Sequence, residues 1–196
     1  MGRQTNESSP KLASAFVVAA TVLSTVTTPA SAAAADSLKN RVFDQGQAFW
    51  SFFSFAPGFS HGSIVWLLGF GKVAQIVNSE VNDSRWRQRL PVKPHRKYLA
   101  MALIKTDNVV TDPHGLGTAC ASIGVEAIDF SHTTLDQFQH STPLCGTHDW
   151  TGASVVICTA DETELYVVDR LGWFAEEAAG TAWFDQNHWI PLGLPC

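Results

Sequence analysis

Two runs of strand-forming residues flank a short acidic turn in the stretch Ala153-Ser-Val-Val-Ile-Cys-Thr-Ala-Asp-Glu-Thr-Glu-Leu-Tyr-Val-Val-Asp169. β-Branched and aromatic residues suit the pleated surface of a sheet, whereas the polar residues at 160–163 suit a turn. We therefore predict that the strands Ala153–Thr159 and Glu164–Asp169 pair as an antiparallel hairpin.

Other segments of the C-terminal part have the same pattern of strand-forming residues between turns. Short apolar or β-branched segments bounded by turn residues occur at Tyr98–Lys105, Ser122–Phe130 and Ala182–Ile190, and each is expected to form a strand. A capping-box pattern that starts at Thr133 predicts a short helix through Gln139. This part of the chain is therefore expected to be a mainly antiparallel sheet with one short helix.

The N-terminal part has helical rather than strand periodicity. Asp36 can cap a helix that runs to about Phe53. Apolar residues then recur every three or four positions from Ser63 to Val81, which predicts a second helix. Together these patterns predict an α+β fold with a helical region at 33–83, a basic linker at 84–97 and a β-rich region at 98–196, packed as a single domain.

Residues 1–32 have the composition of a secretory signal peptide. Arg3 and Lys11 precede an uncharged apolar stretch, and the small residues Pro29-Ala30-Ser31-Ala32 follow it. We expect cleavage after Ala32, which would leave a protein that is secreted or held at the cell envelope. An uncleaved membrane anchor is the alternative, because the uncharged stretch continues to Ala35.

All four cysteines lie in the part that is expected to be exported. An even number of cysteines in an oxidising compartment predicts two disulfides, and four cysteines allow three pairings. We favour Cys120 with Cys145, which closes a loop of moderate length, and Cys158 with Cys196, which would hold the C-terminus. Neither a metal nor a cofactor is expected, because the cysteines lack C-x-x-C spacing and no two histidines are spaced as paired ligands.

Charge is divided unevenly along the chain. Residues 33–105 hold ten lysines and arginines against four acids, whereas residues 106–196 hold one arginine against thirteen acids. Six basic residues fall in one run without an acid: Arg85, Arg87, Arg89, Lys93, Arg96 and Lys97. This run could face an anionic surface, or it could pack against the acidic half of the same chain. Nucleic acid is not an expected partner, because the formal net charge is −5.

Residues 48–77 could contact a membrane. No charged residue occurs in the 24 residues from Ala48 to Gly71, which are rich in Phe and Trp. Such a segment could form two core helices, an aromatic wedge in a lipid surface, or a membrane span. Combined with an uncleaved N-terminal segment, a span here would make a two-pass membrane subunit with a cytoplasmic β-rich domain.

A hydrolase is a further alternative. Gly58-Phe59-Ser60-His61-Gly62 has the G-x-S-x-G pattern that exposes a nucleophilic serine at a strand-turn-helix elbow. Asp169 and His188 follow in the order of a triad, which predicts an esterase-like serine hydrolase with Ser60 as nucleophile, His188 as base and Asp169 as the orienting group. Only 27 residues separate the expected mature N-terminus at Ala33 from Ser60, however, too few for the earlier strands of such a fold.

The β-rich region also holds four tryptophans that could bind a ligand: Trp150, Trp173, Trp183 and Trp189. On one exposed face they would stack against sugar rings or a partner protein, whereas in the core they would serve only packing. Because no complete catalytic constellation occurs, the leading hypothesis is a non-catalytic exported protein that binds a partner protein, a glycan or a lipid surface. The serine hydrolase and the two-pass membrane subunit are the alternatives.

Overall fold

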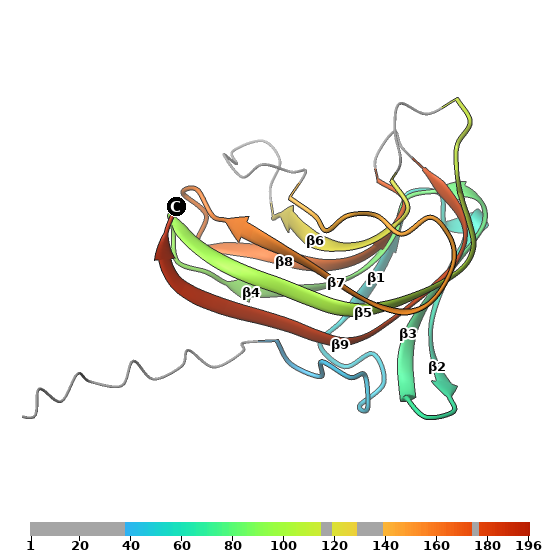
Figure 1. Cartoon of the computed structure of the whole chain (residues 1–196), viewed down its shortest axis with the longest axis horizontal. Helices are drawn as coiled ribbons and strands as arrows, with labels where there is room; N and C mark the ends of the chain where they lie inside the picture. Colours follow the sequence, from blue (N-terminus) through green and yellow to red (C-terminus); the bar gives the residue numbers. More distant parts are fainter. Residues whose placement is uncertain (1–37, 115–118, 129–138, 174–176) are drawn as a thin grey trace, which may run out of the picture. The chain divides into compact units, whose positions relative to one another are not determined.

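The computed structural model describes residues 38–114, 119–128, 139–173 and 177–196 of the chain. Strands fill most of this part, and it contains no α-helix, only a 3-10 turn at Pro57–Phe59 (Figure 1). The prediction of an α+β fold with an N-terminal helical pair is therefore wrong. The short helix that was predicted at 133–139 begins outside the described residues.

The strands form two antiparallel sheets. The four-stranded sheet has the order β1 (Ser51–Ser54), β4 (Ser84–Pro91), β8 (Glu164–Leu171) and β6 (Ala121–Ala127). The five-stranded sheet has the order β2 (Ser60–Leu67), β3 (Gly71–Asn82), β9 (Ala178–Pro195), β5 (Arg96–Thr111) and β7 (Gly146–Cys158). Buried side chains of both sheets share one hydrophobic core, which makes the fold a β-sandwich.

Strands β2 and β3 form a hairpin where the second helix was predicted. Leu67 pairs with Gly71 at its closed end, and both Gly69 and Gly71 have a positive φ, at 85° and 79°. These two glycines allow the turn, because residues with a side chain rarely adopt that conformation. The apolar residues that suggested one helix face are mostly β-branched and belong to two paired strands.

The segment 38–50 is an irregular loop where the first helix was predicted. Asn40 organises this loop, because its Nδ2 donates to the carbonyls of Gly46 (2.8 Å) and Ala48 (3.0 Å). The rings of Phe43 and Trp50 are buried and contact each other, with centroids 5.1 Å apart. Local side-chain hydrogen bonds and aromatic packing thus replace the helical hydrogen bonds.

The predicted basic linker is mostly strand. Ser84–Pro91 forms β4 between β1 and β8, and β5 begins at Arg96. Trp86 and Leu90 are buried while the arginines between them point to the other face of the sheet. Buried and outward-pointing side chains thus alternate along the segment, as they do in a strand. The many charged residues made this alternation hard to recognise in the sequence.

The segments 153–159 and 164–169 are strands, but they do not form the predicted hairpin. Strand β7 pairs with β5 in the five-stranded sheet, and β8 pairs with β4 and β6 in the four-stranded sheet. The connection between them therefore crosses from one sheet to the other. Thr159 holds this crossover to the β4–β5 turn, because its Oγ1 donates to the Lys93 carbonyl (2.7 Å) and accepts from the Arg96 amide (2.9 Å).

Two disulfides join Cys120 to Cys145 and Cys158 to Cys196, which are the pairs that the sequence favours. The second bond connects the end of the edge strand β7 to the residue that follows β9. Among the described residues, no helix is long and apolar enough to cross a membrane. Residues 48–77 form β1, β2 and the first half of β3, so the prediction of helices there is wrong.

Candidate ligand-binding cleft

A row of side chains crosses the exposed face of the five-stranded sheet. Ser63 opposes Gln75, Gln75 opposes Trp183, and Trp183 opposes Lys105 in the strand register. Side chains alternate between the two faces of a strand, and the neighbours of the row on the core side are fully buried: Ala74, Ile76, Ala182, Phe184 and Ile104. The row of Ser63, Gln75, Trp183 and Lys105 therefore faces away from the core.

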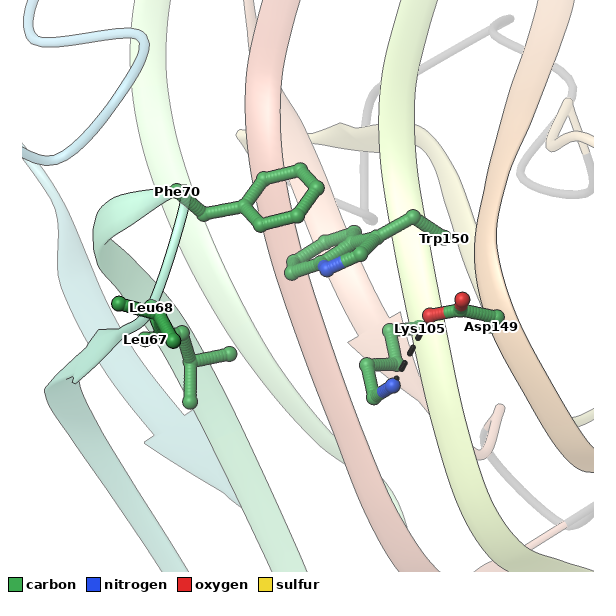
Figure 2. Close-up of a pocket in the computed structure, with 6 residues that line it drawn as sticks. All are labelled: Leu67, Leu68, Phe70, Lys105, Asp149 and Trp150. Atoms are coloured by element: carbon green, nitrogen blue, oxygen red, sulfur yellow. Dashed lines mark hydrogen bonds and ion pairs between the residues drawn. The ribbon is translucent and has the colours of Figure 1, made fainter.

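A cleft of about 390 Å³ lies at the Lys105 end of this row. Figure 2 shows the side chains that line it: Leu67, Leu68, Phe70, Lys105, Asp149 and Trp150. The volume falls at the lower end of the range of small-ligand sites, about 300–1,000 Å³. The cleft is thus large enough for one or two rings of a small ligand.

One wall of the cleft is an aromatic bridge made by Phe70 and Trp150. The two ring centroids are 4.5 Å apart and the ring planes differ by 26°, so the rings stack (Figure 2). Phe70 comes from the β2–β3 turn and Trp150 from β7, and β9 and β5 lie between β3 and β7 in the sheet. At about 4.8 Å per strand, the two side chains together span roughly 14 Å of the sheet face.

The polar part of the cleft is the ion pair of Lys105 and Asp149. Lys105 Nζ lies 2.9 Å from Asp149 Oδ1, and this hydrogen bond, with a second one from the Trp150 backbone, lowers the pKa of Asp149. The Asp149 side chain is 86% exposed, so the pair contributes little to stability. Both charged groups are therefore accessible to a ligand in the cleft.

The structure separates the four tryptophans that were predicted to bind a ligand. Trp150 lines the cleft and Trp183 lies in the adjacent row, and both are partly exposed. Trp189 is fully buried and stacks on Tyr98 at 4.7 Å, and Trp173 is 4% exposed, with its ring 4.0 Å from the Arg170 guanidinium. The prediction of ligand contact is therefore wrong for Trp173 and Trp189.

The basic run does not form one exposed basic surface. Arg85 is buried and its Nη2 donates to Glu126 Oε1 (2.6 Å), while Arg89 pairs with Glu164. Both acids come from the acidic half of the chain, in agreement with the interpretation that the basic run packs against that half. Lys93, Arg96 and Lys97 lie apart from these arginines, around the β4–β5 turn, and Arg87 lies between Arg85 and Arg89 on β4.

The residues of the predicted catalytic triad lie far apart. Ser60 and Gly180 both pair with Asn78, and His188 lies eight residues beyond Gly180 on β9, roughly 26 Å along the strand. Asp169 is fully buried in the core, where it accepts a hydrogen bond from Asn187 Nδ2 (2.9 Å). Ser60 begins a strand rather than an elbow, and its Oγ lies 2.7 Å from Ser84 Oγ. The predicted triad is therefore wrong.

Sequence reasoning missed most of the cleft. Phe70, Lys105 and Asp149 come from three elements that only the strand register brings together. The sequence held one weak indication of a polar site on this sheet face, because Gln75 and Lys105 are polar residues on the outer face of strands whose inner positions are apolar. Gln75 can be assigned to that face only if the segment 71–82 is interpreted as a strand and not as a helix.

No family model and no characterised protein matches the chain. Among solved structures, the one titled "CBM4 structure and function", a carbohydrate-binding module, is similar with a TM-score of 0.54 and 16% identity, over 79% of this chain and 99% of that chain. The complex of TmCBM61 with β-1,4-galactotriose has a TM-score of 0.52 and 11% identity, and the match covers 80% of this chain and 99% of that chain. Bacteriophage CBA120 tailspike protein 4 has a TM-score of 0.58 and 10% identity, over 80% of this chain and only 21% of that one. At these identities the likeness shows the fold alone.

Proposed function

We propose that this protein is a non-catalytic glycan-binding protein, and that a neutral sugar chain binds in the cleft beside the aromatic bridge. The observation that carries the proposal is the stacked pair of Phe70 and Trp150 next to the exposed ion pair of Lys105 and Asp149, in one cleft of about 390 Å³. A sugar ring has apolar C–H faces and a rim of hydroxyl groups. The first suits an aromatic wall, and the second suits charged donors and acceptors.

The ion pair favours a neutral ligand over a charged one. Asp149 can accept a hydrogen bond from one hydroxyl of the sugar, and Lys105 can donate to a neighbouring hydroxyl. The two side chains carry no net charge together, so the cleft offers no excess charge that would attract a charged ligand. Neighbouring hydroxyl groups on one sugar ring satisfy both residues without separating them.

The fold supports the same reading. Two of the structures that share it are carbohydrate-binding modules, and one of these is bound to β-1,4-galactotriose. Short neutral oligosaccharides, β-1,4-galactotriose among them, are therefore the first ligands to test on this chain.

We also propose that the protein works outside the cytoplasm, secreted or at the cell envelope. Its two disulfides support this location, because such bonds persist in oxidising compartments. Residues 1–32 would then serve as the signal for export. The intact mass of the native protein, measured with and without reduction, tests both cleavage after Ala32 and the presence of two disulfides.

Calorimetric titration of the purified protein with neutral oligosaccharides tests glycan binding. The panel contains β-1,4-galacto-, xylo-, cello- and arabino-oligosaccharides, and at least one is expected to bind. Trp150→Ala should weaken binding by at least about tenfold, because aromatic anchors dominate contact energy. Phe55→Ala is the matched control, since Phe55 is 72% exposed and lies outside the cleft, and it should bind like the wild type.

Two results would overturn this proposal. One is a folded wild-type protein that binds none of the neutral oligosaccharides. The other is unchanged affinity in Trp150→Ala, which would place any glycan elsewhere on the molecule. Chromatography of the bound oligosaccharide after long incubation tests the non-catalytic part, and a shortened product would contradict it.

A further inference from the structure

Arg87 occupies the middle of β4, on the exposed face of the four-stranded sheet. Its strand neighbours Trp86 and Gln88 are buried, at 1% and 4% exposure, so the Arg87 side chain points away from the core. Its guanidinium carbon lies 4.5 Å from the ring centroid of Tyr166 and 5.3 Å from that of Phe53. Tyr166 comes from β8 and Phe53 from β1, and we call the two rings the aromatic clamp of Arg87; Phe53 also contacts the Arg85 guanidinium, at 4.2 Å.

Arg87 differs from the other two arginines of β4 in its charge balance. Arg85 pairs with Glu126 and Asp83, and Arg89 pairs with Glu164. Within the described part of the chain, no carboxylate pairs with Arg87, and its buried Nε has no hydrogen-bond partner. Arg87 therefore presents one uncompensated positive charge on this sheet face.

The aromatic clamp favours a particular kind of anionic group as the ligand of Arg87. Stacking against aromatic rings holds the guanidinium plane, and a fixed guanidinium offers two parallel N–H donors to a planar acceptor with two oxygens. A carboxylate matches that geometry. We propose that Arg87, Phe53 and Tyr166 form a second binding site, which takes the carboxylate of an acidic sugar unit such as a uronic acid residue.

Two observations favour an acidic glycan over other anionic partners. The chain carries a net charge of −5 and Glu164 lies beside the site, so a densely charged surface such as nucleic acid or an anionic membrane is repelled. Phe53 is 38% exposed, so part of its ring lies next to the charge, although the Arg85 guanidinium also stacks over this ring at 4.2 Å. A uronic acid joins one isolated carboxylate to a flat ring, whereas an acidic peptide has no such ring.

This second site does not depend on the cleft of the five-stranded sheet. The two sites lie on different sheets, and the shared hydrophobic core separates their exposed faces. Trp150→Ala is therefore expected to leave the binding of an acidic glycan unchanged. Failure of one proposal can in this way be distinguished from failure of the other.

The test is binding of partly methyl-esterified polygalacturonate, in which the free carboxylates are isolated from one another, to the purified protein by affinity electrophoresis or calorimetry. Arg87→Gln should weaken binding by at least about tenfold, because hydrogen bonds to charged groups are among the strong ones. Arg87→Lys keeps the positive charge but loses the two parallel N–H donors of the guanidinium, so this variant should retain only part of the affinity. The matched control is Arg89→Lys, on the same strand, which keeps the positive charge beside Glu164 and should change affinity less than about twofold.

The comparison of ligands decides the chemical class. Fully methyl-esterified polygalacturonate has the same backbone without the charge, and it should not bind to the Trp150→Ala variant, in which the cleft for neutral sugar chains is disrupted. Equal binding of the esterified form in the Trp150→Ala variant, or an equal loss in Arg89→Lys and Arg87→Lys, would overturn the site. Binding of dextran sulfate or poly-glutamate as tight as that of polygalacturonate would overturn the assignment to a sugar carboxylate. Thermal unfolding of each variant confirms that the fold is retained before affinities are compared.

Discussion

Asp169 is expected to make the folded protein more stable in acid than at neutral pH. Its carboxyl group is fully buried between the sheets. Burial raises the pKa of Asp169 from 3.8 to about 8, against the hydrogen bond from Asn187, which lowers it. Burial also raises the pKa of the neighbouring Asp185, to about 6.

The direction of the effect follows from proton uptake on folding. Between about pH 4 and pH 8 the folded protein keeps the Asp169 proton that the unfolded chain has released. The stabilisation is therefore complete below pH 4 and is lost as the pH rises toward 8, by up to about 1.4 kcal/mol per pH unit. From pH 5 to pH 7 the free energy of unfolding should fall by roughly 3 kcal/mol, with a further contribution from Asp185 below pH 6.

Urea denaturation followed by tryptophan fluorescence at pH 5, 6 and 7 measures this slope. Asp169→Asn cannot ionise, yet its amide oxygen can still accept the Asn187 hydrogen bond. This variant should show little pH dependence above pH 6 and should exceed the wild type in stability at pH 7. Asp185→Asn is the control and should keep the slope above pH 6. A wild-type stability that is constant from pH 5 to pH 7, or an equal slope in Asp169→Asn, would refute the reasoning.

Two further predictions concern stability at constant pH. Gly172→Ala should lower the free energy of unfolding by about 3 kcal/mol, because Gly172 has a φ of +82° and an added Cβ would lie 2.1 Å from the Asn82 carbonyl oxygen. Gly58→Ala is the control and should be nearly neutral, because an added Cβ at Gly58 meets no atom within 4 Å. Replacing Cys120 and Cys145 together by alanine should cost about 3.5 kcal/mol in urea denaturation, since that bond closes a loop of 25 residues, and a loss below about 1 kcal/mol would contradict the estimate.

The sequence predicted the strands of the C-terminal part better than their pairing. All five segments that were expected to be strands lie largely within β5 to β9. The acidic turn at 160–163 suggested a hairpin, because local composition reveals a turn but does not reveal which sheet the next strand joins. In this protein the turn is a crossover between sheets.

The N-terminal part was predicted wrongly for a physical reason. Steps of three or four between apolar residues in 63–81 fit one helix face, but the same residues also fit two strands that are joined at Gly69 and Gly71. The two glycines and the many β-branched residues were the better guide. The tertiary context decided the outcome, because strand β9 provides a partner for β3.

The candidate cleft could be predicted only in part. Trp150 and Trp183 stood out because exposed aromatic residues of a sheet are suited to ligand contact. Phe70 and Lys105 did not, since their roles arise from the order of strands in the five-stranded sheet. That order depends on pairing between residues far apart in the sequence, which local patterns do not encode.

The central place of β9 also affects how the chain is made. Strands β3 and β5 are translated early, yet neither can complete its side of the sheet until β9 enters between them. The hydrogen bond from Asn78 Nδ2 to the Ala178 carbonyl, for example, joins residues 100 positions apart. Before β9 is made, the five-stranded sheet of the nascent polypeptide can consist only of the β2–β3 hairpin and, once β7 is complete, the β5–β7 pair. Each of these leaves an open edge, and such edges invite aggregation. A chaperone that shields unpaired strands is expected to raise the yield of this protein more than a faster rate of translation.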